Sequence, residues 1–232
     1  KSQVIGLLAA ALGIERTDEP RQAALAAAIA LAVRVDDPGA LIQDYHTVQQ
    51  PAGPAVRRRL RAGGTVATRA EELDFGPGEL ETTLSRREYR RDAAYTIAVW
   101  LTNAGAVTLE ALAKAIAAPN FILAAGRRAN ALMFPCGPLV TSAEPDVLAA
   151  FAAYDAGDEE RRAFRNTWTP PWLAERRATA TRTLYADETV ELPATAKVVR
   201  HEQRRDIPRT RQGWRFGLRT EKVIDLPSPE ES

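Results

Sequence analysis

The sequence predicts an α+β fold in which a ferredoxin-like βαββαβ domain lacks its first strand. Apolar residues recur at helical or strand spacing in the order helix, helix, strand, strand, strand, helix, strand. A stretch rich in proline, glycine and charge, 49–84, interrupts this order before the third strand. The composition changes again after residue 157. We therefore predict a domain over 1–157 with an arm inserted at about 49–86, and a small, mainly β domain with an acidic tail over 158–232.

The composition is that of an ordinary globular protein, with 45% hydrophobic and 26% charged residues among 232. The net charge of +1 does not by itself indicate a nucleic-acid binder. Only four of the 31 cationic residues are lysine. Arginine forks suit phosphate contacts and stacking on bases, but a GC-rich genome gives the same bias, so both explanations stay open.

The cysteine and histidine content limits the chemistry of the chain. A single cysteine, Cys136, excludes an internal disulfide and a cysteine-based zinc site, and two histidines leave little for a metal cluster. We expect no cofactor, a reducing cytoplasm, and Cys136 as a small buried filler. No apolar run approaches the roughly 20 residues that a membrane span needs.

The first predicted element is an amphipathic helix over 1–12. Its start at Lys1 and Ser2 is a candidate phosphate site, because backbone N–H groups at a helix N-terminus attract anions. The chain begins inside this periodic segment, so we expect the natural protein to have residues before it. The apolar face consists of Val4, Ile5, Leu7, Leu8, Ala11 and Leu12.

A second helix is predicted from Asp18 or Thr17, with Pro20 in its first turn, to about Ala27. Residues 29–33 then alternate as a strand that ends at the turn 36–39. The next strand, 41–48, is expected to pair with it as a hairpin. Helices are expected on one face of the resulting sheet, and the other face is expected to be free.

The arm and the strand after it combine charge and apolar character. Residues 57–61 are arginine-rich and residues 71–81 are acidic, so 49–84 is either a mobile loop or an extended cationic arm. Segment 85–101 predicts one long strand with an arginine-rich start and an apolar end in the middle of the sheet. Some arginines of 86–91 are expected to pair across the hairpin with Glu71, Glu79 and Glu81.

The remaining elements follow from caps and alternation. Thr108 is expected to cap a helix to Ala117, and a further helix spans 146–154. A linker into the second domain is predicted at Trp168, Pro170, Pro171 and Trp172. Short strands are predicted at 121–123, 181–185, 196–199 and 214–218. Tyr95 and Trp100 are expected in the core, because their strand carries almost no charge.

Four collinear strings resemble the CasD subunit family of the type I-E CRISPR Cascade complex. They are KSQVIGLLAAALGI at 1–14, DYHTV at 44–48, REYRRDAAYTIAVWLT at 87–102 and GRR at 126–128. The resemblance covers about 1–135 and continues faintly through 184–185 and 207–214. The first strand of the family has no counterpart here.

The resemblance implies a non-catalytic, RNA-binding role. Members of this family look like RRM-type folds with a β-hairpin thumb, here about 49–86. They cap the 5′ handle of the crRNA and contact the CasC backbone subunit and the large CasA subunit, so target DNA is met only through the complex. The RNA-binding candidates in this chain are Lys1, Ser2, Arg57, Arg58, Arg59, Arg87, Tyr89, Arg127 and Arg128.

Two alternatives remain at the level of sequence. Tyr45 and His46 are adjacent, and such a pair can cleave RNA without metal by moving protons at the 2′-hydroxyl. Neighbours in a strand point to opposite faces, so the pair converges only if the strand is bulged. In the type I-E complex a separate subunit, CasE, processes the RNA, which favours a non-enzyme. The second alternative is a generic RRM-like RNA-binding protein that works alone.

Overall fold

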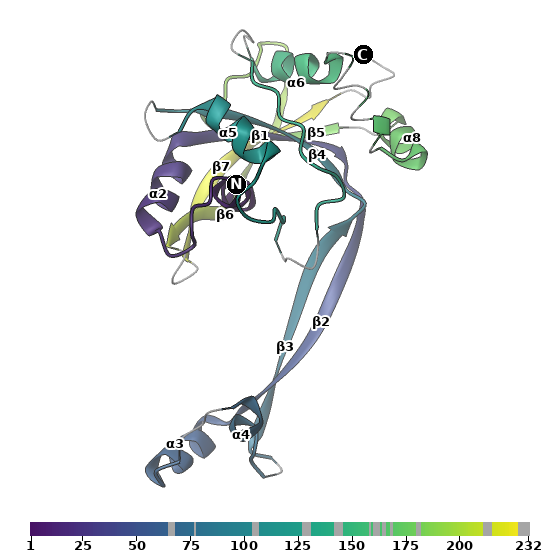
Figure 1. Ribbon diagram of the computed structural model, residues 1–232. Helices are drawn as coiled ribbons and strands as arrows, with labels where there is room; N and C mark the ends of the chain where they lie inside the picture. Colours follow the sequence, from purple (N-terminus) through teal and green to yellow (C-terminus); the bar gives the residue numbers. More distant parts are fainter. Residues whose placement is uncertain are drawn as a thin grey trace. The chain divides into compact units, whose positions relative to one another are not determined.

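The chain forms two compact units in a computed structural model, Lys1–Pro38 with Asp92–Ser232 and Gly39–Arg91 (Figure 1). The structure describes residues 1–64, 68–76, 78–103, 107–126, 131–141, 146–157, 159, 163, 166–167, 169–179, 182–210 and 215–226. Within these residues, no helix combines the length and apolar character that crossing a membrane requires.

A five-stranded sheet is the centre of the larger unit, and all of its neighbouring strands are antiparallel. β1 lies between β4 and β5, so its two edges are occupied by strands from distant parts of the chain. The strands in spatial order are β4 (Ala94–Leu101), β1 (Ile29–Asp37), β5 (Arg182–Asp187), β7 (Arg215–Leu226) and β6 (Val198–Thr210).

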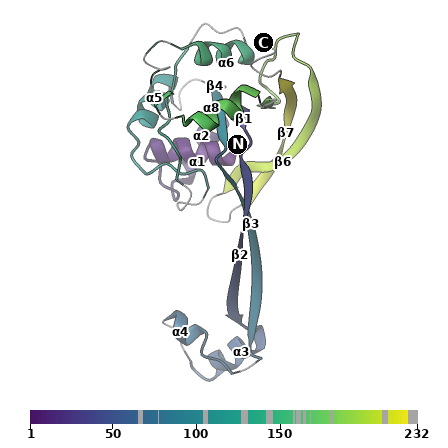
Figure 2. The ribbon, with the colours of Figure 1, turned by 90° about the vertical axis from the view of Figure 1, so that its right-hand side faces the viewer.

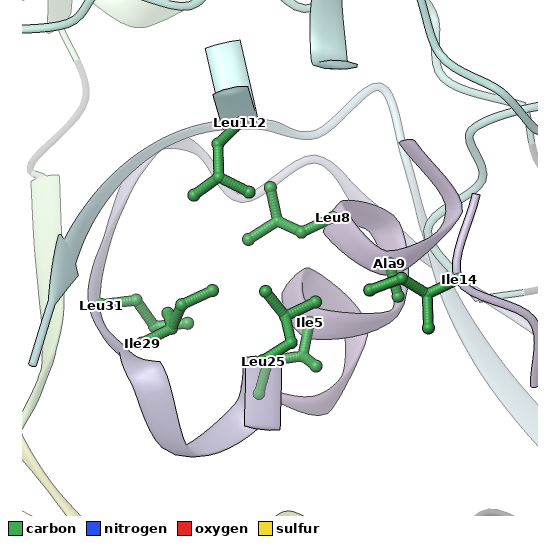
Figure 3. Close-up of a cluster of buried hydrophobic side chains, with 8 residues drawn as sticks. All are labelled: Ile5, Leu8, Ala9, Ile14, Leu25, Ile29, Leu31 and Leu112. Carbon is green, nitrogen blue, oxygen red and sulfur yellow. The ribbon is translucent and has the colours of Figure 1, made fainter. Parts of the chain in front are cut away.

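Helices cover both faces of β1. Successive side chains of this strand point to opposite sides of the sheet, and each side packs against its own helices. On one side, α1 (Ser2–Ala11), α2 (Glu19–Ala28) and α5 (Leu109–Ala117) enclose a buried cluster around Leu31 (Figure 3). On the other, α6 (Val147–Ala156) packs onto Ala30 and Ala32. The expectation of one free sheet face is therefore wrong at β1.

Side-chain caps begin three of the helices: the cap predicted at Thr108 is confirmed, and the cap of α2, for which Thr17 and Asp18 were both candidates, is Asp18. The carboxylate of Asp18 accepts the backbone N–H of Arg21 at 3.2 Å at the start of α2. Thr108 accepts from Ala111 at 3.1 Å at the start of α5. Asp146, ahead of α6, accepts from Leu148 at 2.8 Å. Each oxygen satisfies a backbone donor that has no partner inside the helix.

The C-terminal strands do not form a core of their own, which differs from the predicted second domain. β5 pairs with β1 on one side and β7 on the other, so residues 182–226 complete the sheet that begins at β1. The predicted Trp-Pro-Pro linker contains the start of α8 (Pro171–Thr179), where the side chain of Leu173 is fully buried. Proline is compatible with a first helical turn, so Pro170 and Pro171 mark the start of this helix.

The smaller unit is a ribbon of two strands with two helices between them in the chain (Figure 2). β2 (Ala40–Pro51) and β3 (Leu80–Arg91) pair antiparallel without interruption from Ala40–Arg91 to Pro51–Leu80. The partner of 41–48 is thus β3 and not 29–33, because both edges of β1 are taken. The helices are α3 (Gly53–Arg61) and α4 (Arg69–Glu72), which the sequence reading assigned to an irregular arm.

Segment 85–101 is two strands and not one. β3 ends at Arg91 and β4 begins at Ala94, and between them Asp92 has a φ of 57°. This left-handed backbone is open to aspartate more than to most residues, and it separates two different sheets. β4 lies at the edge of its sheet, so the expectation of a central strand is also wrong.

Three smaller expectations are also wrong, two of them because the side chain is exposed. Tyr95 on the edge strand is 45% exposed, whereas Trp100 packs against the cluster beside α6 as expected. Cys136 is exposed and is not a buried filler. Residues 121–123 form no strand, and the nearest pairing is a single bridge between Ala124 and Ala131.

Candidate nucleic-acid interface

The register of the ribbon divides its side chains between two faces. In an antiparallel pair, directly opposed residues point to the same side, so the unbroken register assigns every side chain to a face. The His46 face consists of Ile42, Asp44, His46 and Val48 with Tyr89, Arg87, Ser85 and Thr83 opposite them. The Tyr45 face consists of Leu41, Gln43, Tyr45 and Thr47 with Arg90, Glu88, Arg86 and Leu84.

The His46 face brings together Arg87 and Tyr89, two of the RNA-binding candidates predicted from the sequence. Arg87 lies opposite Asp44, and Tyr89 lies two residues further along the same strand, opposite Ile42. Arg87 is exposed and Tyr89 is half-buried. A guanidinium next to a phenol ring offers a phosphate contact and a stacking surface at neighbouring positions, which suits single-stranded RNA.

The geometry of β2 separates Tyr45 from His46. Nε2 of His46 lies 3.4 Å from Oδ2 of Asp44 on its own face, while Tyr45 lies beneath Arg86 on the other, with 5.9 Å from the guanidinium carbon to the ring centre. The ladder has no bulge at either position. The two side chains therefore do not converge on one substrate atom, as a proton-transfer pair must.

Two of the arginines of α3 form contacts within the smaller unit. Arg58 forms an ion pair with Glu79, and Arg59 donates to the carbonyl of Asp74 at 2.7 Å with its guanidinium 4.2 Å from the centre of the Phe75 ring. Arg57 is exposed. Two of the RNA contacts predicted on α3, Arg58 and Arg59, thus bond to residues that precede β3 in the same unit.

In the acidic stretch 71–81, Glu71 and Glu79 contact arginines of α3. The hydrogen bond from Arg58 lowers the pKa of the Glu79 carboxyl below its ordinary value. Glu71 accepts from Arg59 through its backbone carbonyl. The register places Glu81 opposite Gln50, at the other end of the ribbon from Arg86–Arg91. The expected pairing of this stretch with those arginines is wrong for Glu79, whose partner is on α3.

The start of α1 faces carboxylates of its own chain. Nζ of Lys1 lies 2.7 Å from Asp187, and Arg219 contacts Asp187 at 3.0 Å and Asp206 at 2.6 Å. Carboxylates near a helix N-terminus interact favourably with its dipole, as a phosphate does. The predicted pair Lys1 and Ser2 therefore lies at an internal ion cluster. Arg127 and Arg128 lie outside the described residues.

A buried ion network, which sequence reasoning missed, holds β1 where it leads to the ribbon. Arg34 is 4% exposed; it donates to Asp36 at 2.6 Å and to both carboxylate oxygens of Asp155 at 2.6 and 2.8 Å. Burial alone would lower the pKa of Arg34, but these two carboxylates raise it, so the guanidinium stays charged. The available signal was an arginine and an aspartate two residues apart in an apolar strand, which share a face.

Sequence reasoning also gave no role to the second face of the ribbon. Arg86 and Arg90 alternate with Arg87 along β3, and this period-two spacing is the signal that places them on the other face of the ribbon from Arg87.

Among the described residues, no group of three or more histidine, cysteine, aspartate or glutamate side chains is arranged to hold a metal ion.

Comparison with protein families gives a match over most of the chain. The family model described as "CRISPR-associated protein (Cas_Cas5)" matches residues 1–221. The CRISPR system Cascade subunit CasD of Escherichia coli strain K12 is 35% identical over 135 residues, or 58% of this chain and 55% of the relative. The alignment thus spans about half the length of this curated relative, and it confirms the resemblance that the four strings carried.

Solved structures show the same kind of fold. A chain of a CRISPR RNA-guided surveillance complex superposes with a TM-score of 0.54 at 24% identity, covering 100% of this chain and 80% of that one. A crystal structure of a Cas protein gives a TM-score of 0.50 at 23% identity, covering 98% of this chain and 80% of that one. At these identities the likeness concerns the mixed α/β architecture with antiparallel sheets.

Proposed function

Because the chain belongs to the Cas5 family of CRISPR-associated proteins, we propose that it is a non-catalytic Cascade subunit that binds and caps the 5′ handle of the crRNA. The observation that carries this proposal is the placement of Arg87 and Tyr89 side by side on the His46 face. In this role the protein works in the cytoplasm, contacts the CasC backbone and large CasA subunits, and supports recognition of target DNA through the complex.

We interpret the fold in the same terms. The five-stranded sheet with its helices is a ferredoxin-like, RRM-like domain, and the ribbon with α3 and α4 is the thumb. Support comes from the antiparallel sheet, which packs against helices, and from the separate two-stranded ribbon, whose strands are joined through α3 and α4.

The mechanism needs no chemical step, only contacts with phosphates and bases. Arg87 donates to a phosphate of the handle, and the ring of Tyr89 stacks on a neighbouring base. Arg57, exposed on α3, adds a phosphate contact, and Arg127 with Arg128 supplies further ones. Lys1, Arg58 and Arg59 serve mainly as internal ion-pair partners, because their cationic groups already contact acidic or carbonyl oxygens.

The test is protection of the crRNA 5′ end in complexes assembled with the sister subunits. Complexes that contain the wild-type chain are expected to resist a 5′ exonuclease, and simultaneous charge reversal at Arg87, Arg127 and Arg128 is expected to expose the handle. Arg215→Glu, at an exposed arginine of β7, serves as the control. Full protection in the triple variant would rule out handle capping by these residues.

The enzymatic alternative is tested separately. Incubation of the purified protein with repeat RNA and a metal chelator should leave the RNA intact. Cleavage that disappears in His46→Ala would assign a nuclease activity to this chain and contradict the non-catalytic role.

A further inference from the structure

A carboxylate lies within the proposed RNA surface, beside the arginine that is expected to bind a phosphate. Asp44 is the direct cross-strand partner of Arg87 on the His46 face of the ribbon. The side chain of Asp44 is 46% exposed, so a ligand that reaches Arg87 also reaches this carboxylate. An ionised carboxylate repels a phosphate and only accepts hydrogen bonds. Asp44 is therefore unfavourable for any ligand that offers no hydrogen-bond donor at this place.

The carboxylate is oriented by a neighbour on its own strand. Nε2 of His46 lies 3.4 Å from Oδ2 of Asp44, and both side chains belong to the same face. This distance exceeds the range of about 2.7–3.2 Å that is usual for an N–H···O hydrogen bond. The two oxygens together offer about four lone-pair sites, more than the contact with His46 uses. Asp44 is thus suited to accept a hydrogen bond from a ligand.

The backbones of RNA and DNA differ in whether they supply such a donor. Phosphates and deoxyribose offer acceptors, whereas the ribose 2′-hydroxyl both donates and accepts. In RNA this hydroxyl and a phosphate of the same nucleotide are neighbours on the sugar. A guanidinium beside a carboxylate therefore matches a ribonucleotide. A deoxyribonucleotide at the same place brings a phosphate close to the carboxylate without the compensating hydrogen bond.

The register supplies one group for each part of a ribonucleotide. Directly opposed side chains of an antiparallel pair have Cβ atoms about 5 Å apart, which places Asp44 beside Arg87. Tyr89 follows on the same face two residues along β3, or about 7 Å further. Phosphate, sugar and base thus meet a guanidinium, a carboxylate and an aromatic ring at neighbouring positions.

We propose that Asp44 is a specificity-determining residue, whose carboxylate accepts a hydrogen bond from a ribose 2′-hydroxyl and so selects RNA over DNA of the same sequence. The inference rests on the proposed function and adds the residue that recognises the sugar. His46 is a positioning residue, because its ring acts on the ligand through Asp44. Arg87 does not discriminate, since both nucleic acids carry phosphates.

The test compares the affinities of the protein for handle RNA and for DNA of the corresponding sequence at one salt concentration. The wild-type protein is expected to bind the RNA about tenfold or more tightly, because DNA lacks a hydrogen bond to a charged group. Asp44→Ala is expected to bring the two affinities within about twofold of each other. The matched control Glu88→Ala removes a carboxylate from an exposed position on the Tyr45 face and should leave the RNA-to-DNA ratio unchanged.

Single 2′-deoxy substitutions along the handle RNA locate the hydroxyl without altering the protein. One position is expected to lower the wild-type affinity about tenfold and to have no further effect in Asp44→Ala, because both changes remove the same interaction. If no position lowers the wild-type affinity, the proposal is overturned whether or not a variant folds. Additive effects of the two changes overturn it as well. So does coupling of Asp44 to a change of base and to no sugar, because the carboxylate then reads a base edge.

Handle binding by the His46 face is decided by a different variant. Arg87→Ala is expected to weaken the binding of RNA and of DNA by similar factors, because it removes a phosphate contact. If it does so while Asp44→Ala keeps the wild-type RNA-to-DNA ratio, handle binding stands and sugar recognition by Asp44 is overturned. If Arg87→Ala leaves the affinity for handle RNA unchanged, the proposed handle-binding role of Arg87 fails. A ratio that still depends on Asp44 then supports the sugar contact alone.

Discussion

Arginines in this chain have three different roles, and the residue type alone does not indicate which role an arginine has. Arg34 is buried against Asp36 and Asp155, Arg58 is exposed but paired with Glu79, and Arg87 is exposed on the His46 face of the ribbon. The first supports the sheet, the second the end of the ribbon, and the third is a candidate RNA contact. Burial and strand register make the distinction.

Replacing Arg34 tests the support that its ion network gives to the larger unit. Arg34→Met leaves Asp36 and Asp155 with the longer contacts to Arg182, at 3.9 and 3.8 Å, so we expect the free energy of unfolding to fall by about 3 kcal/mol. Urea denaturation followed by tryptophan fluorescence measures this change. Arg21→Met, on the exposed surface of α2, is the control and should change stability little. A loss below about 1 kcal/mol for Arg34→Met would show that the network is not structural.

At the residue scale, the sequence predicted which ribbon residues share a face better than it predicted buried contacts. Arg87 and Tyr89 share a face because they are two residues apart in a strand, which spacing alone shows. The partner of Arg34 is 121 residues away on α6, and no local pattern connects them. The pairing of Glu79 with α3 was missed because the helix itself was missed.

The elements around the ribbon depend on two local features of the chain. Gly53 and Pro54 form the first turn of α3, where proline needs no hydrogen-bond partner for its nitrogen. Asp92 adopts a left-handed conformation that ends β3 and lets β4 begin. Gly53 and Pro54 indicate a break in the sequence, whereas Asp92 lies inside a segment that was predicted as one strand; both are positions where one element passes into the next.

The junction at Asp92 is expected to tolerate asparagine and to reject a β-branched residue. Valine in a left-handed backbone costs roughly 1–2 kcal/mol, whereas asparagine visits this region readily. We therefore expect Asp92→Val to lower the unfolding midpoint of the chain and Asp92→Asn to leave it nearly unchanged. Thermal unfolding by circular dichroism compares the two. Equal midpoints for both variants would mean that the observed φ does not constrain this position.

The ion pair between Arg58 and Glu79 makes the end of the ribbon sensitive to acid. The folded-state pKa of Glu79 lies below its unfolded value, so its stabilising effect is present above the unfolded pKa and is lost as pH falls through the folded one. We expect amide exchange in α3, corrected for its intrinsic pH dependence, to accelerate over that acidic range. In Glu79→Gln this acceleration should be absent. The same pH response in both proteins would exclude Glu79 as its source.

At the element scale, boundaries set by caps could be predicted, and pairings could not. The starts of α2, α5 and α6 follow from Asp18, Thr108 and Asp146, whose oxygens bind the nearest backbone donors. The pairing of β2 with β3 instead depends on β4 and β5 occupying both edges of β1. That competition between strands is a property of the whole sheet.

For the whole molecule, the family is the firmest conclusion, because its model matches residues 1–221. The sequence indicated it through four short strings, whereas the division into domains did not follow from composition. Residues 158–232 look different because they are rich in arginine and strand-like runs, yet β5 lies between β1 and β7 in one sheet. Domain boundaries depend on which strands pair, and here the pairing is between distant segments.

The salt dependence of handle-RNA binding by the isolated protein tests the central claim most directly. For single-stranded RNA, each phosphate contact contributes about 0.7 to the slope of log affinity against log salt. We expect Arg87→Ala to reduce the magnitude of that slope by about this amount, and Arg86→Ala, on the opposite face of β3, to leave it unchanged. Equal slopes for wild type and Arg87→Ala, or a flat response of the wild-type protein, would contradict the account.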